Sequence, residues 1–157
     1  MQNIFKMLIK THLAITGFFI LLFISAVEHK AIFILTSILA TYLPDVDSRF
    51  STIGQKFLSR ILQFFTKHRG VLHSFSFLFL VTLVLALFFP IISLGFFLGY
   101  SSHLIADSFT LDGIRPFYPL KKMSSGKIST GGIMDSSIFY SFIVVDLVLI
   151  VVEIMRI

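Results

Sequence analysis

The sequence predicts an all-α protein: a polytopic bundle of about five transmembrane helices, one domain over residues 1–157, with an added amphipathic helix at the membrane interface. The chain is 56% hydrophobic and only 13% charged, whereas a soluble domain is nearer half apolar and a quarter charged. Five apolar runs are separated by short polar segments. Twenty phenylalanines and no tryptophan suit a lipid-facing surface, and the absence of cysteine excludes disulfides and thiolate metal sites.

The apolar runs are expected to form the helices. They are Leu13–Val27, Ala31–Leu43, Phe75–Phe89, Ile91–Ala106 and Ile138–Val152. The first run could instead be a signal peptide, but FISAVEHK after it lacks a clear A-x-A cleavage pattern, so we expect a retained helix. Each run is shorter than the roughly 20 residues of an ideal span. Flanking polar residues extend most of them to that length, and the second run remains short.

The basic residues predict the orientation of the helices. If all five runs span, the N-terminus, residues 48–70 and residues 111–137 lie on one side, and they hold 11 of the 13 lysines and arginines. The positive-inside rule makes that side cytoplasmic, which places the N-terminus inside and the C-terminus outside a multi-pass inner-membrane protein. The net charge of +5 therefore reports topology, and no nucleic-acid partner is expected.

Residues 53–67, IGQKFLSRILQFFTK, are expected to form the interfacial helix. Their apolar residues recur at helical spacing, while Lys56, Arg60 and Lys67 share the other face. The alternative is a basic loop that only fixes topology.

Four histidines and three aspartates lie at the expected cytoplasmic ends of four helices. Ionisable groups in membrane segments are costly and usually functional, and no periodicity requires these residues to share one depth. We therefore predict a metal site at the cytoplasmic edge of the domain. Its candidate ligands are His12, Asp45, Asp47, His68, His73, His103 and Asp107. Taken singly, each could be an ordinary interfacial or turn residue.

Two of the spacings favour convergence directly. His103 and Asp107 are four residues apart, so on a helix they share a face. Asp45 and Asp47 follow Pro44, which ends the second helix, and in an extended turn both carboxylates would point the same way.

The two histidines of TKHRGVLHSFSF require a break in the helix. His68 and His73 are five residues apart and would diverge on a continuous helix. They converge only if Gly70 interrupts the backbone, which would leave His73 or Ser74 to cap the third helix.

The mixture of imidazoles and carboxylates suits zinc, manganese or iron(II) better than calcium or magnesium. Seven ligands exceed the three or four that hold one catalytic zinc, so we expect two divalent ions, zinc being favoured and manganese or iron possible. Such a pair suits phosphoester hydrolysis. Asp45 or Asp47 would bridge the ions or accept a proton, and Arg69 and Arg115 could neutralise a phosphoryl group. Singly, both arginines could be topology charges.

Three segments resemble the signature blocks of a known family. LPDVDS, HRGVLHS and GYSSHLIADSFTLDGIRPFYPL are similar to those of the YdjM-like family, LexA-regulated inner-membrane proteins assigned as metal-dependent hydrolases. The likeness runs from His12 to about Asp135, and the seven candidate ligands stand at the family's polar positions. It implies a helical membrane protein and a metal-dependent hydrolase. The stretch STGGIMDSSIF resembles a family segment that often carries glutamate, where this chain has the shorter Asp135.

These observations together predict a membrane-embedded, metal-dependent hydrolase of phospholipase or phosphoesterase type. Its substrate would be an ester or phosphoester in a lipid or lipid-linked molecule at the cytoplasmic interface, and its partners the bilayer and that amphiphilic substrate. One alternative is a metal-ion or small-solute transporter, in which histidines and aspartates form a relay. Another is a non-catalytic membrane adaptor whose basic loops bind anionic lipid. The sequence makes no prediction of oligomeric state.

Overall fold

The described part of the chain is entirely helical. The computed structural model describes residues 9–47 and 70–156, and within them five α-helices and two short 3-10 segments occur without a strand. The elements are α1 (Ile9–Phe23), η1 (Ile24–Ala26), α2 (Lys30–Tyr42), η2 (Leu43–Asp47), α4 (Phe75–Phe88), α5 (Pro90–Ser108) and α6 (Ile133–Met155). The all-α prediction is confirmed, and each apolar run coincides with one helix. The predicted interfacial helix at residues 53–67 lies outside the described residues.

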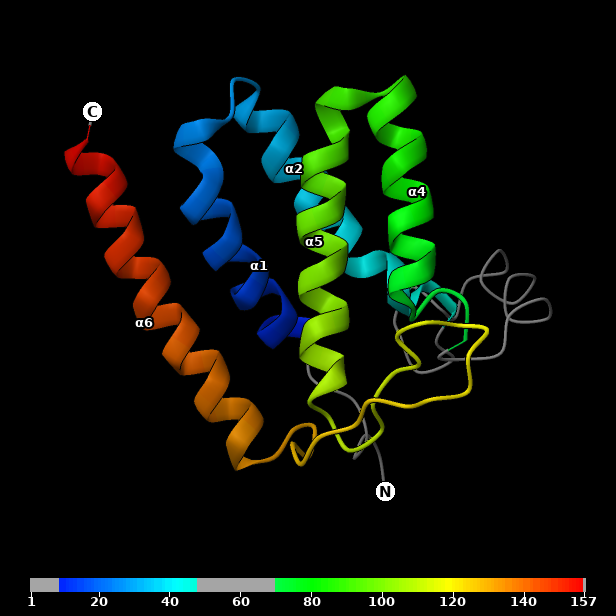
Figure 1. The fold of residues 1–157 in the computed structure, drawn as a ribbon. Coiled ribbons are helices and arrows are strands. Elements are labelled where there is room, and N and C mark those ends of the chain that lie inside the picture. The colour runs from blue at the N-terminus through cyan, green and yellow to red at the C-terminus, as the bar shows by residue number, and fades with distance from the viewer. Residues whose placement is uncertain (1–8, 48–69, 157) are drawn as a thin grey trace.

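The helices run alternately up and down, as Figure 1 shows. The start of α1, the end of α2, the start of α4 and the end of α5 lie together at the lower end of the view, and α6 also begins there. We call this the site end of the bundle. The short connections from α1 to α2 and from α4 to α5 lie at the opposite end, where Pro90 occupies the first turn of α5. Proline is well tolerated there because its missing N–H would have no helical partner.

The lengths of the described helices support membrane crossing for two of them. Ile9–Ala26 and Ile133–Met155 are long and apolar enough to cross a membrane. The 14 residues of α4 and the 13 of α2 are shorter, since at a rise of about 1.5 Å per residue they span roughly 20 Å of an apolar layer about 30 Å thick. The prediction of five spanning helices is therefore not confirmed.

Glycines allow α2 and α5 to approach each other closely. A Cβ on Gly99 would lie 2.0 Å from the carbonyl oxygen of Ser37, and a Cβ on Gly95 would lie 2.0 Å from the hydroxyl oxygen of Thr36. Small residues four positions apart on one face are typical of helix pairs in membranes. This contact fixes the separation between the end of α2 and the second half of α5, the two segments that lead to the candidate site.

The loop between α5 and α6 is ordered by backbone pairing. The backbones of Ile114 and Ser124 exchange hydrogen bonds of 2.8 and 2.9 Å. This pair forms the base of a smaller loop that includes residues 116–123. Thr110 forms a second bridge with Ile128, and Gly113 adopts a φ of +61°, a conformation that favours glycine.

We expect Gly99→Ala to lower the free energy of unfolding by about 1–3 kcal/mol, because the added methyl group would overlap the Ser37 carbonyl. Gly17→Ala is the matched control, since its Cβ would meet the flexible carboxylate of Asp146 at 3.1 Å. Thermal unfolding of the detergent-purified variants, followed by circular dichroism, measures the difference. Equal melting temperatures for the two variants would contradict the close approach of α2 and α5.

Candidate metal centre

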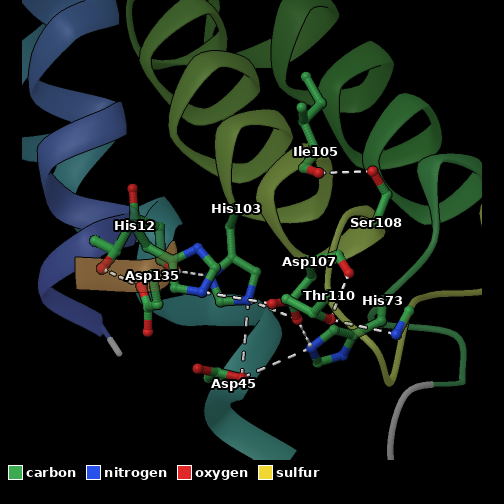
Figure 2. Close-up of polar contacts among 12 residues, drawn as sticks. His12, Asp45, His73, His103, Ile105, Asp107, Ser108, Thr110 and Asp135 are labelled. Atoms are coloured by element: carbon green, nitrogen blue, oxygen red, sulfur yellow. Dashed lines mark hydrogen bonds and ion pairs between the residues drawn. The ribbon is translucent and has the colours of Figure 1, made fainter. Parts of the chain in front are cut away.

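Five of the seven predicted ligands meet at the site end of the bundle, as Figure 2 shows. They are His12 of α1, Asp45 of η2, His73 of the turn before α4, and His103 and Asp107 of α5. We call them the five-residue cluster. Their side chains are fully buried except that of Asp45, which is 8% exposed. Four separate stretches of backbone therefore deliver imidazoles and carboxylates to one small volume.

Four possible metal-ligand atoms of the cluster, two imidazole nitrogens and two carboxylate oxygens, form a ring with nearly equal spacing. His73 Nε2 lies 3.7 Å from Asp45 Oδ1 and 3.6 Å from Asp107 Oδ2. His103 Nε2 lies 3.8 and 3.7 Å from the same two oxygens. These separations exceed the roughly 2.7–2.9 Å of a charge-assisted hydrogen bond. They are close to the spacing of about 3.3–3.6 Å between the ligands of a tetrahedral ion that lies 2.0–2.2 Å from each.

His12 adds a fifth donor on the other side of Asp107. Its Nε2 lies 3.5 Å from Asp107 Oδ1, and its ring stacks on that of His103 with a centroid separation of 4.0 Å and an angle of 9°. The two oxygens of Asp107 thus face different histidines. The cluster contains two overlapping groups able to hold an ion, His12 with His103 and Asp107, and Asp45 with His73 and His103, each with ligand atoms within 4.8 Å of one another.

The orientation of His103 is fixed by a backbone carbonyl. Its Nδ1 lies 2.8 Å from the carbonyl oxygen of Thr41, which can only accept a hydrogen bond, so Nδ1 carries the proton. The Nε2 lone pair then faces Asp45 and Asp107. A backbone acceptor for the second ring nitrogen is typical of metal-binding histidines, because it fixes the tautomer and the direction of the ring.

Comparison with known proteins places the chain among inner-membrane proteins. The profile of the YdjM inner membrane protein family matches residues 7–156, nearly the whole chain. The chain belongs to this family. The resemblance seen in the sequence is therefore confirmed, and the family name supports an inner-membrane location.

A curated relative covers less of the chain. The uncharacterized protein YvsG of Bacillus subtilis (strain 168) is 35% identical over 81 residues, which are 49% of this chain and 51% of YvsG. The chain thus spans about half the length of that relative in the match. No solved structure matches the chain significantly.

In this YdjM-family protein the turn before α4 is held from two sides. The Tyr100 hydroxyl of α5 donates to the carbonyl of Leu72. The Ser74 side chain accepts a hydrogen bond of 3.2 Å from the N–H of Phe77 and caps α4, which confirms the prediction that His73 or Ser74 caps this helix. His73 lies between these two anchors, which direct its ring into the cluster.

The environment of His73 favours its neutral form. Burial lowers the pKa of the imidazole below its usual value, and this effect exceeds the opposing influence of Asp45 and Asp107. Neutral imidazole is the form that binds metal ions. The ring is therefore suited to metal binding without prior loss of a proton at neutral pH.

The segment after α2 differs from the sequence prediction. Residues Leu43–Asp47 form a 3-10 helix instead of an extended turn. Pro44 removes the N–H that would continue the α-helix, while its fixed φ remains compatible with the tighter turn. The extended conformation predicted for this segment is therefore wrong. Asp45 reaches the cluster, and the side chain of Asp47 lies outside the described residues.

The other predicted site residues are not brought to the five-residue cluster by any described contact. His68 and Arg69 lie outside the described residues. Arg115 is half-buried in the loop after α5. His29, the remaining histidine, is exposed and precedes α2, which begins at the opposite end of the bundle.

Asp135 has a positioning role that the sequence left open. It is fully buried in the first turn of α6. Its Oδ1 accepts a hydrogen bond of 2.6 Å from the hydroxyl of Thr11, and its Oδ2 accepts one of 2.8 Å from the N–H of Gly131. Thr11 precedes His12, so Asp135 ties the start of α6 to the residue beside a cluster histidine. The threonine next to His12 was the available sequence signal.

We expect Thr11→Val, which is similar in size, to lower the free energy of unfolding by about 1.5–3 kcal/mol, because it removes a hydrogen bond to a buried carboxylate. Ser137→Ala is the matched control, since that exposed hydroxyl bonds only the carbonyl of Ile133 in its own helix. Chemical or thermal unfolding in detergent checks the difference. A Thr11→Val protein as stable as the Ser137→Ala protein would exclude this tie between α1 and α6.

Proposed function

We propose that this YdjM-family protein is a membrane-embedded, metal-dependent hydrolase. Its substrate class is a phosphoester or other ester in a lipid or lipid-linked molecule at the cytoplasmic interface. The observation that carries the proposal is the ring of four buried donor atoms spaced 3.6–3.8 Å apart. A buried set of imidazoles and carboxylates on separate helices has no evident structural purpose that apolar residues would not serve with less desolvation cost.

The donor set fits divalent ions of the zinc, manganese or iron(II) type. Asp45, His73 and His103 would hold one ion, while His12 and Asp107 would begin a second site beside His103. The proposal of two ions would draw further ligands from Asp47 and His68. When bound, such ions would lower the pKa of water and stabilise negative charge on phosphoryl oxygens.

Asp45 is the cluster residue best placed to exchange a proton with the surroundings. Its side chain is 8% exposed, whereas those of His12, His73 and Asp107 are fully buried. Among the five cluster residues, Asp45 is therefore the one whose side chain has any exposure. Asp45 or Asp47 would bridge the ions or act as the general base, and Arg69 and Arg115 would neutralise a phosphoryl group on the substrate.

The membrane arrangement belongs to the same proposal. All five described helices would cross the bilayer, with the N-terminus and the site end on the cytoplasmic side. The outward side chains of the short helix α4 support this, since Leu80, Leu87 and Phe88 are more than 60% exposed. Apolar surface of this extent is typical of contact with lipid. The cluster would then lie near headgroup depth, which favours an amphiphilic substrate.

The metal content of the detergent-purified protein tests this proposal. We expect the wild-type protein to retain zinc, manganese or iron through gel filtration, and the His73→Ala, Asp107→Asn double variant to lose it while its helical circular dichroism is kept. His29→Ala serves as the control, because His29 is exposed at the opposite end. Equal metal content in the wild-type and double-variant proteins would refute the metal centre, and with it the hydrolase.

A substrate screen follows for protein that retains metal. Phosphodiester, phosphomonoester and carboxylester lipids cover the proposed chemistry, and we expect turnover of one class. Asp45→Asn should then lower kcat by a factor of roughly 10² or more, as for loss of a general base. Metal-loaded protein that hydrolyses none of the three classes would contradict the assignment as a hydrolase.

A transporter is the second candidate, and buried polar groups above the cluster favour it. The hydroxyl of Thr16 lies 2.8 Å from that of Thr41 and 2.7 Å from that of Ser102. On the outer helix α6, Asp146 is 8% exposed. These groups continue away from the site end, as an ion or proton relay would. Metal uptake into proteoliposomes that Thr16→Val abolishes, without any hydrolysis, would favour transport.

A further inference from the structure

We propose that residues 116–123, the tip of the loop between α5 and α6, form a platform that binds the headgroups of anionic phospholipids beside the metal centre. This platform is independent of the reaction that the centre performs. Its composition, its rigidity and its position each support the assignment.

The tip exposes three large apolar side chains and two adjacent cationic ones. Phe117, Leu120 and Met123 are 57%, 64% and 54% exposed, and Lys121 and Lys122 between them are also exposed. Exposed apolar groups of this size are unusual on a loop that faces water. Aromatic and lysine side chains together are typical of the membrane interface, where the rings reach the upper acyl chains and the ammonium groups face phosphates.

The tip is held rigidly by the elements that carry the cluster. The N–H of Phe75 in the first turn of α4 donates a hydrogen bond of 2.7 Å to the carbonyl of Pro116. The hydroxyl of Thr110 donates one of 2.7 Å to the carbonyl of Asp107, a cluster residue. Figure 1 shows the loop at the site end, below α4 and α5. A lipid bound at the tip would thus lie beside the cluster, on a surface that is ordered before binding.

The charge of the loop selects an anionic occupant. Residues 109–132 contain four basic residues and a single acidic one, Asp112. A second copy of the same loop would be repelled by this excess of positive charge. Lipid phosphates attract it, and each lysine near an anionic membrane surface strengthens binding by about fivefold.

Tryptophan fluorescence tests whether the tip enters the bilayer. The chain has no tryptophan, so Phe117→Trp provides a single reporter in the full-length protein in nanodiscs. Tyr140→Trp sets the reference, because Tyr140 is 64% exposed on α6, one of the helices long enough to span. We expect brominated phosphatidylglycerol to quench both reporters. An unquenched Phe117→Trp with water-like emission, as docking to a soluble protein or a second copy would produce, would overturn the proposal.

Lipid titration by native mass spectrometry tests the lysines. We expect the Lys121→Gln, Lys122→Gln double variant to bind phosphatidylglycerol roughly 25-fold more weakly, with no change for phosphatidylcholine. The matched control, Lys30→Gln with Arg156→Gln, removes the same charge from exposed residues away from the site end. Unchanged binding in the tip variant, or equal loss in both variants, would overturn the proposal. The metal content of the tip variant should stay at the wild-type level, so a failure here is separable from failure of the metal centre.

Discussion

The burial of two carboxylates and three imidazoles in one small volume is the constraint on which the rest of this structure depends. Removing ionised groups from water is costly unless a partner of opposite charge replaces the lost hydration. Asp45 and Asp107 face histidines, of which His73 is shifted toward its neutral form by burial. A divalent cation would add positive charge beside these two carboxylates. Metal binding and the stability of the site end should therefore be coupled.

The packing of the bundle serves this requirement through small residues and hydroxyl groups. Gly99 lets α5 lie against the backbone of α2, which brings the carbonyl of Thr41 to His103. The Thr41 hydroxyl also donates a hydrogen bond to the carbonyl of Ser37. The same hydroxyl lies 2.8 Å from the hydroxyl of Thr16. Helix contact and ligand orientation are thus set by the same residues. A substitution at Gly99 would therefore displace the ring of His103 without contacting it.

Much of the fold could be predicted from the sequence, because apolar runs and their breakers are local signals. The site was predictable where spacing alone decides, as for His103 and Asp107 on one helical face. The site was not predictable where its geometry depends on residues that are distant in the sequence. The 3-10 conformation around Asp45 depends on how α2 ends, and the contact of Asp135 with Thr11 joins residues 124 positions apart. The Gly99 contact likewise acts only once α2 lies beside α5.

The position of the cluster within the fold limits what could reach it. Its fully buried members are enclosed by the helices, and its partly exposed member, Asp45, lies at the site end, the end that also carries the loop tip with Lys121 and Lys122. A substrate that reaches Asp45 from the leaflet would bring its polar head to the ligands while its chains stay in lipid. A water-soluble substrate would gain nothing from the exposed apolar residues of the tip. Under the proposed hydrolase function, this arrangement would favour a lipid phosphoester over a soluble one.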